Sequence, residues 1–174
     1  MCPIVDIKEE KISKRNNNVK RGQYLEHLIK NTIEHYCMEQ KILLNIYDRP
    51  KKVQQAGYKL LSDYWFVDYL GRFNLIECKV IDSITSFPFS RIDDHQYMNL
   101  YRTDKAKHSS GWLIINFKME HDDFAFYRIY GKFLFCLKHN YCKVMNKYGV
   151  ISEDRKSFTL NDLRFLRKHT KFVL

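Results

Sequence analysis

An apolar run from Phe73 to Val80, FNLIECKV, carries an acid and a base two positions apart, Glu77 and Lys79. Its β-branched and aromatic residues predict a strand, and alternate side chains of a strand share a face. Glu77 and Lys79 therefore lie side by side, about 7 Å apart at their Cα atoms. Burying such a pair is a costly way to stabilise a fold. The run therefore indicates either a functional site or an exposed strand with an incidental ion pair.

The segments around this run predict one domain of the α/β class. A helix begins at Arg21 and Gly22, where apolar residues start to recur at helical spacing. Pro88 blocks helix before it, and Ser90 followed three residues later by Asp93 resembles the capping box of a second helix. We expect helices at 22–37, after 90 and at 159–170, and strands at 41–47, 72–80, 110–117, 123–130 and 132–139. Short turns join the last three strands, so the fold is a mixed sheet, partly an antiparallel meander, flanked by helices.

The charge of the chain indicates a polyanionic partner. The net charge is +10 and the pI is near 9.3, and the segment 131–174 holds ten Lys and Arg against three Asp and Glu. Such a pattern is typical of nucleic-acid binding, or of a solvated helix face. No run of about 18 apolar residues occurs, so we expect no membrane span. Residues 1–19 are polar and contain NNN, which predicts a flexible basic arm before a single domain at 20–174.

The five cysteines argue against a disulfide framework, because the count is odd and no CxxC pair occurs. A reducing cytoplasm is therefore the expected location. Cys136, His139 and Cys142 offer three zinc ligands, but no fourth ligand is nearby. Packing of these residues on or beside a strand is the simpler explanation.

Glu77 and Lys79 suit metal-assisted hydrolysis of a phosphodiester when a second acid lies nearby. A carboxylate binds hard cations such as Mg²⁺, and an ammonium beside it holds a water or offsets phosphate charge. Asp63, in the upstream segment LSDYW, offers the second carboxylate. The spacing alone is a weak signal, because charged pairs at i and i+2 are common on exposed strands. Asp63 is also explained as a turn residue, and Gln96 as a polar residue at a helix boundary.

A longer set of motifs resembles one family. The segments RGQYLEHLIKNT (21–32) and RPKKVQ (49–54) are similar to the opening helix and a following segment of the RecU-type Holliday junction resolvases. SDY, YLGRF, IECK, TSFPF and HQ then resemble the active-site block of that family. Gln96 comes 19 positions after Glu77, in agreement with the family spacing. The similarity runs from about residue 20 to the C-terminus and is weaker after Tyr101.

The resemblance implies a restriction-endonuclease-like core of the PD-(D/E)xK superfamily. It also implies a homodimer that depends on Mg²⁺, with one or two ions per protomer, and that nicks four-way DNA junctions in pairs during recombination and repair. A recombinase filament is a further candidate partner. Matching positions make Asp63, Glu77 and Gln96 metal ligands, and Lys79 the residue that orients the attacking water or stabilises the transition state. As contacts to DNA phosphates we expect some of Lys20, Arg21, Arg72, Arg164, Arg167 and Lys168.

Departures from the family pattern leave alternatives open. The family has a metal-binding Thr two residues before its Asp, where this chain has Leu61. A bulge would bring Ser62 into that place, or water would fill it. Asp68 is a less favourable substitute for Asp63, and the long stalk of the family is reduced to 54–61. The alternative functions are therefore a catalytically impaired junction-binding protein that modulates a recombinase, and a less selective nuclease of the same fold.

Overall fold

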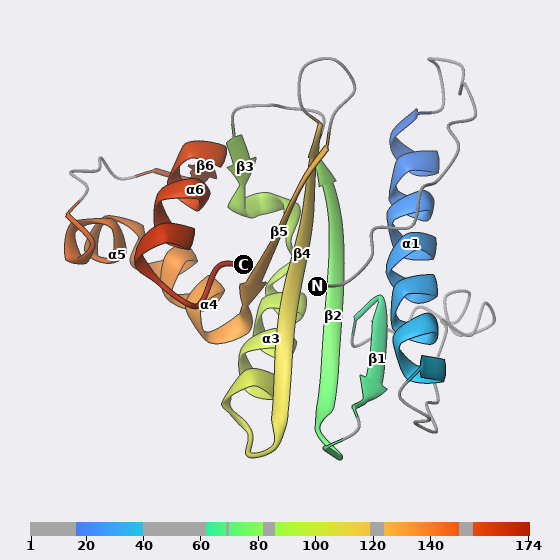
Figure 1. Cartoon of the computed structure of the whole chain (residues 1–174). Coiled ribbons are helices and arrows are strands. Elements are labelled where there is room, and N and C mark those ends of the chain that lie inside the picture. The colour runs from blue at the N-terminus through green and yellow to red at the C-terminus, as the bar shows by residue number, and fades with distance from the viewer. Residues whose placement is uncertain (1–16, 40–61, 69, 82–85, 119–123, 150–154) are drawn as a thin grey trace.

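The structure, a computed structural model, describes residues 17–39, 62–68, 70–81, 86–118, 124–149 and 155–174 (Figure 1). Its elements in chain order are α1 (Asn17–Glu39), β1 (Tyr64–Val67), β2 (Phe73–Ile81), β3 (Ser86–Pro88), the 3-10 helix η2 (Phe89–Arg91), α3 (Asp94–Lys105), β4 (Ser109–Lys118), β5 (Phe124–Tyr130), α4 (Gly131–His139), α5 (Tyr141–Lys147), β6 (Ser157–Thr159) and α6 (Leu160–His169). The strand predicted at 41–47, the shortened stalk at 54–61 and most of the arm predicted at 1–19 lie outside the described residues.

The central sheet has four strands in the order β1-β2-β4-β5. β2 pairs antiparallel with β1 and parallel with β4, and β4 pairs antiparallel with β5. Parallel neighbours need a long crossover connection. Here the segment between β2 and β4 contains α3, which packs against β4. This mixed sheet with flanking helices confirms the predicted fold class.

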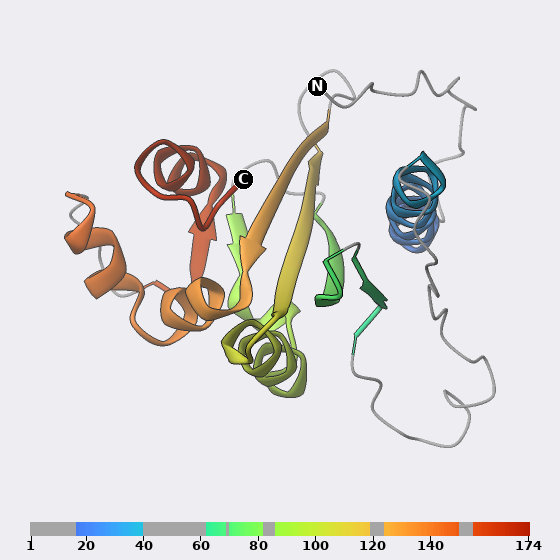
Figure 2. The same ribbon diagram turned by 60° about the horizontal axis from the view of Figure 1, so that its bottom comes forward.

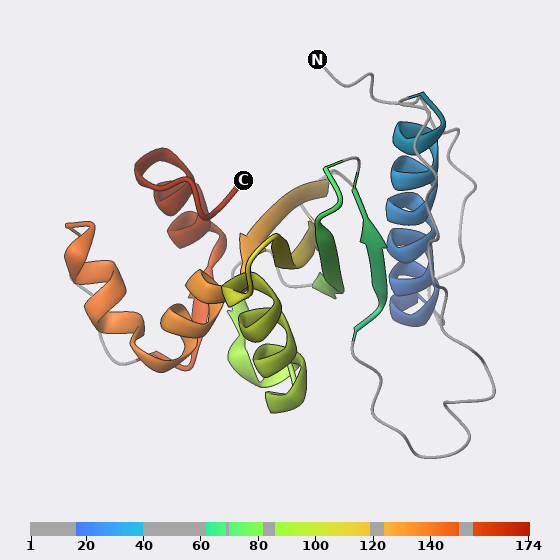
Figure 3. The ribbon, with the colours of Figure 1, turned by 90° about the horizontal axis from the view of Figure 1, so that it is seen from below.

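Different helices cover the two faces of the sheet (Figures 2 and 3). α1 lies along one face, where Leu25 packs with Ile76 and Cys78 of β2. On the other face Leu75 of β2 belongs to the main core, which includes apolar residues of α3, α4 and α6. Because side chains alternate along a strand, Glu77 turns to the same face as Leu75. The acid of the central strand therefore faces α3.

A second sheet, formed by β3 and β6, fixes the segment that follows β2. Phe87 lies opposite Phe158, with stacked rings whose centroids are 5.0 Å apart. Phe89 meets Phe158 edge-on at 5.5 Å. All three rings are buried, and burying a ring of this size contributes about 1.5–3 kcal/mol. The SFPF segment is therefore an anchor that joins the start of α3 to the C-terminal part of the chain.

Two glycines allow α3 to pack closely against the sheet. A Cβ atom on Gly111 of β4 would lie 2.2 Å from the backbone oxygen of Leu100, and one on Gly131 would lie 2.3 Å from the same oxygen. Both distances are far below ordinary van der Waals contact. The Leu100 carbonyl of α3 is thus held between β4 and the start of α4, and any larger residue at either position requires the backbone to shift.

Two predicted helix starts are corrected by the structure. α1 begins at Asn17 rather than at Gly22, since glycine within a helix costs only about 1 kcal/mol relative to alanine. α3 is capped by Asp93, which forms a capping box with Gln96, whereas Ser90 belongs to η2. The D-x-x-Q pattern carries this signal in the sequence, but the S-x-x-D match just before it competes.

The segment KFLFCLKH, predicted as a third strand of the meander, is the helix α4. Its buried residues Phe133, Leu134 and Leu137 recur at helical spacing. A contact from another element stabilises this helix, because Asp104 Oδ2 of α3 accepts a hydrogen bond from the Lys132 backbone N–H at 3.0 Å. The carboxylate thereby caps the positive end of α4. Propensity alone did not reveal this long-range cap.

Candidate functional site

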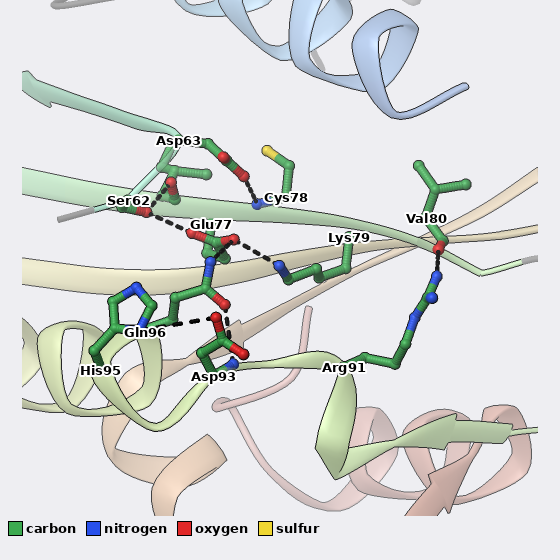
Figure 4. Close-up of polar contacts among 11 residues, drawn as sticks. Ser62, Asp63, Glu77, Cys78, Lys79, Val80, Arg91, Asp93, His95 and Gln96 are labelled. Atoms are coloured by element: carbon green, nitrogen blue, oxygen red, sulfur yellow. Dashed lines mark hydrogen bonds and ion pairs between the residues drawn. The ribbon is translucent and has the colours of Figure 1, made fainter. Parts of the chain in front are cut away.

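Glu77 is a buried carboxylate in the middle of the central strand. It lies opposite Leu113 of β4 and is only 1% exposed. A carboxylate buried to this degree is stable only when its oxygens accept hydrogen bonds or bind a cation. Figure 4 shows that its carboxylate points toward the start of α3.

Both oxygens of Glu77 are engaged. Oε1 lies 2.8 Å from Lys79 Nζ and accepts a hydrogen bond from Gln96 Nε2 at 2.5 Å. Oε2 lies 3.2 Å from Ser62 Oγ. Strand alternation thus places Glu77 and Lys79 side by side, as the sequence predicts. The first turn of α3 brings Gln96 onto the same carboxylate from 19 positions away.

Gln96 is held in place by the capping box of its own helix. Its Oε1 accepts the backbone N–H of Asp93 at 3.1 Å. Arg91 lies at the end of η2, just before α3. Its guanidinium donates a hydrogen bond to the Val80 carbonyl of β2 at 3.2 Å, and this contact connects η2 to β2. Asp93 is therefore a residue that positions the site. Sequence reasoning missed this role because it assigned the cap to Ser90.

The Asp63 side chain contacts β2 at Cys78, the residue that follows Glu77. It is 3% exposed, and its Oδ2 accepts the backbone N–H of Cys78 at 2.8 Å. In Figure 4, Asp63 reaches the strand from the side of Cys78, whereas the Glu77 carboxylate points to Gln96. The structure therefore gathers Glu77, Lys79 and Gln96 in one cluster, and it places Asp63 on the adjoining part of the strand.

The Ser62 hydroxyl reaches the cluster from the segment just before β1. Its Oγ donates a hydrogen bond to the Ile76 carbonyl and lies beside Glu77 Oε2. The sequence singles out Ser62 only as the hydroxyl nearest to Leu61, which lies outside the described residues. The contact with Glu77 identifies Ser62 as a member of the site.

Asp68 organises the turn between β1 and β2. Its Oδ1 accepts the backbone N–H groups of Leu70 and Arg72 at 2.9 and 3.0 Å, and its Oδ2 accepts Arg72 Nε at 2.7 Å. Burial by itself raises the pKa of Asp68, but the hydrogen bonds from Arg72 and Leu70 lower that pKa overall. These contacts give Asp68 a structural role in the hairpin, remote from the Glu77 cluster.

We expect Asp68→Asn to lower the free energy of unfolding by about 1 kcal/mol at neutral pH, because an amide nitrogen faces Arg72 Nε in place of an oxygen. The folded pKa lies below the ordinary value of 3.8. The stabilisation is therefore present above that value and is lost as the pH falls through the folded pKa. Urea unfolding of the wild type and of Asp68→Asn, at neutral pH and at about pH 2, measures this stabilisation. A difference that persists unchanged in acid contradicts the assignment.

The predicted phosphate contacts lie on separate surfaces of the structure. α1 carries Lys20, which is exposed, and Arg21, which is half-buried. α6 carries three exposed basic residues, Arg164, Arg167 and Lys168. Figures 1 to 3 place α1 and α6 on opposite sides of the sheet. Arg72 is paired with Asp68, with its side chain 47% exposed. Across the described ranges, no helix is long and apolar enough to cross a bilayer.

The donors around Glu77 suit Mg²⁺. Hard cations prefer oxygen ligands. Glu77 and Ser62 supply a carboxylate and a hydroxyl in the cluster, and Asp63 supplies a second carboxylate from the adjoining part of the strand. The two carboxylates are buried on neighbouring segments of the sheet, where a divalent cation would offset their charge. In the described part of the chain, no group of three or more His, Cys, Asp or Glu side chains is placed to hold a metal ion. A cation here therefore needs neutral oxygens beside the two acids, and the zinc alternative at Cys136 and Cys142 gains no support.

A family model matches most of the chain. The model described as RecU, recombination protein U, matches residues 20–164. A search of the curated proteins finds no match to the chain. The matched range includes Glu77, Lys79 and Gln96 together with the Ser62–Asp63 pair.

Proposed function

The chain belongs to the RecU family of Holliday junction resolvases, and from this premise we propose that it is a Mg²⁺-dependent endodeoxyribonuclease that resolves junctions by paired nicking. Membership of the family supports a role at Holliday junctions in recombination. One observation carries the catalytic part of the proposal. The Glu77 carboxylate, 1% exposed, lies 2.8 Å from an ammonium and 2.5 Å from an amide. A carboxylate and an ammonium held this closely suit metal-assisted hydrolysis of a phosphodiester.

In this proposal Glu77 and Asp63 are the carboxylates that hold Mg²⁺, with one or two ions per protomer. Ser62 and Gln96 are the neutral side chains that contact Glu77, and one of them supplies a further oxygen. Bound Mg²⁺ supplies Lewis-acid activation of water and offsets charge on the phosphate. The donor set supports this role, because two buried carboxylates and a neutral oxygen are ligands that Mg²⁺ prefers.

Lys79 is the residue that we assign to the transition state. Its side chain is 22% exposed, so its ammonium is within reach of a phosphate oxygen while it stays beside Glu77. A fixed positive charge at this place stabilises the negative charge that grows on the phosphate, and it orients the attacking water. Hydrolysis then leaves a 5′-phosphate and a 3′-hydroxyl.

Paired nicking needs two such sites, and we propose a homodimer to supply them. The twofold axis of the dimer relates its two sites in the same way as the approximate twofold axis of a junction relates its opposed strands. The basic residues of α1 and α6 contact phosphates, which the net charge of +10 supports. Binding of this kind weakens steeply with salt. A recombinase filament is a further proposed partner. The cytoplasm is the proposed location, which the odd cysteine count and the sequence without CxxC pairs favour.

Cleavage of a mobile four-way junction, beside linear duplex of the same sequence, tests the proposal. We expect nicks on opposed strands in the presence of Mg²⁺, no nicks with EDTA, and little cutting of the duplex. Equal cleavage of both DNAs would favour a less selective nuclease, an alternative that the short segment at 54–61 supports. Junction binding without nicking would favour a catalytically impaired junction-binding protein that modulates a recombinase.

A further inference from the structure

One half of the sheet is open on the side that faces away from Glu77. Side chains alternate along a strand, so even-numbered residues of β2, β4 and β5 share the side of α1, and Glu77 lies on the other. α1 covers the β1–β2 half of this side, where Leu25 packs with Ile76 (Figures 2 and 3). The other half, which we call the β4–β5 face, consists of the register pairs Trp112–Tyr130, Ile114–Arg128 and Asn116–Phe126. Phe126 is 43% exposed, so solvent reaches this face.

Arg128 lies over two aromatic rings of this face. The centre of its guanidinium is 4.5 Å from the centroid of the Trp112 ring and 5.5 Å from that of Tyr130. Cation–π attraction of this kind orders a guanidinium and leaves its charge in place. Among the residues that the structure describes, no carboxylate forms an ion pair with Arg128. The β4–β5 face therefore carries an ordered positive charge without a counter-charge.

Three buried polar atoms of the β4–β5 face have no hydrogen-bond partner within the described ranges. They are Trp112 Nε1, Arg128 Nε and Asn116 Oδ1. Asn116 is 6% exposed. Buried polar groups are nearly always paired in folded proteins, so atoms of this kind indicate a polar partner. The edges of a nucleobase carry both acceptors and donors, as two N–H groups and an amide oxygen require.

We propose that the β4–β5 face binds single-stranded DNA, with unpaired bases stacked on Phe126 and Arg128. These two residues lie two positions apart on β5, so their side chains are neighbours about 7 Å apart at the Cα atoms. Aromatic rings and guanidinium planes are the groups on which unpaired bases stack. The charge of Arg128 also attracts phosphates. The site lies on the opposite side of the sheet from Glu77 and does not depend on the proposed Mg²⁺ chemistry.

Charge and shape favour this occupant over two others. A second copy that packed the same face against itself would bury each Arg128 against a surface without an acid, which is costly. A DNA duplex offers the edges of its bases in the grooves and keeps their flat faces stacked on one another. An unpaired strand offers both negative charge and free base faces.

The fluorescence of Trp112 locates the site. The chain has two tryptophans, and Trp65 lies half-buried beside Phe73 on the other side of the sheet, so Trp65→Phe leaves Trp112 as the only reporter. With EDTA present to prevent nicking, an oligothymidylate of about 12 nucleotides should quench this emission until saturation. A duplex of the same length should leave the emission almost unchanged. Oligothymidylate binding without quenching, or equal quenching by the duplex, overturns the proposal.

Fluorescence anisotropy of labelled oligothymidylate compares matched variants. Phe126→Ser removes the exposed ring, and Arg128→Lys keeps the charge but loses the flat guanidinium, so each should weaken binding about fivefold or more. Tyr24→Ser is the control, because Tyr24 of α1 is 46% exposed, much as Phe126 is. It should bind within about twofold of wild type. Thermal unfolding shows that each variant is folded, and the exposed position of Phe126 keeps the test valid if Arg128→Lys is not. Wild-type affinity in Phe126→Ser overturns the proposal.

Sedimentation velocity separates a DNA site from a contact between copies. Phe126→Ser should have the same oligomeric state as wild type. A smaller species in Phe126→Ser means that two copies bury this face, and it overturns the single-strand site. Absence of Mg²⁺-dependent nicking in the wild type overturns the proposed function and leaves this site standing.

Discussion

Glu77→Gln protein should bind a four-way junction with at least wild-type affinity and nick it about a thousandfold more slowly or worse. The change keeps the size of the side chain but removes the negative charge that would hold Mg²⁺ and that faces Lys79 Nζ at 2.8 Å. Glu77 is 1% exposed, so the bound DNA does not depend on it for affinity. Single-turnover cleavage with Mg²⁺ measures the rate, and a gel shift with Ca²⁺ measures binding.

Asp94→Asn is the matched control for this prediction. It removes one negative charge from the first turn of α3, where the Asp94 side chain is 92% exposed and paired with Lys138. We expect nicking within about threefold of wild type, as for an exposed ion pair of small energetic value. Near-normal nicking by Glu77→Gln would place the catalytic centre elsewhere. Loss of junction binding in that variant would indicate a structural role for the carboxylate.

Gly111→Ala should destabilise the protein by about 2–4 kcal/mol, a large share of the stability of a domain of this size. The new methyl group would lie 2.2 Å from the Leu100 oxygen and 2.8 Å from the Leu100 carbonyl carbon, both backbone atoms that no rotamer change can move. α3 has to shift away from β4, which also loosens the contact of Gln96 with Glu77. Urea unfolding followed by circular dichroism measures the change in the free energy of unfolding.

Gly22→Ala is the matched control for the glycine prediction. Gly22 lies inside α1, and a Cβ built there meets nothing within 4 Å. Alanine should stabilise the helix by about 0.5–1 kcal/mol, because it has the higher helix propensity. The same mutation is thus expected to have opposite signs at the two positions. Equal effects would show that close packing on the Leu100 carbonyl does not decide the outcome.

Local periodicity was enough to predict the parts of the site that lie close together in the sequence. The pairing of Glu77 with Lys79 follows from strand alternation, and their contact is confirmed. The helix α1 was also predictable from apolar residues at helical spacing, and the strands β2, β4 and β5 from their β-branched and aromatic content. The family resemblance added Gln96, whose contact with a strand 19 positions away no local rule predicts.

The remaining features depend on contacts between distant segments. The start of α4 is capped by Asp104 of α3, and the pairing of β3 with β6 depends on rings of Phe87 and Phe158 that are far apart in the sequence. The orientation of the Gln96 amide depends on which residue caps α3. Such interactions leave no periodic signal, so the sequence predicts the side chains of the site but not the direction in which each one points.

The pairing of β3 with β6 has a consequence for the order of events during synthesis. Phe158 lies 71 positions after Phe87, so it leaves the ribosome long after Glu77 and Lys79 have emerged. Until then Phe87 lacks the ring on which it stacks at 5.0 Å, and the segment that leads into α3 lacks its anchor. A nascent chain that stops short of Phe158 therefore carries Glu77 and Lys79 before the segment that leads into α3 is fixed.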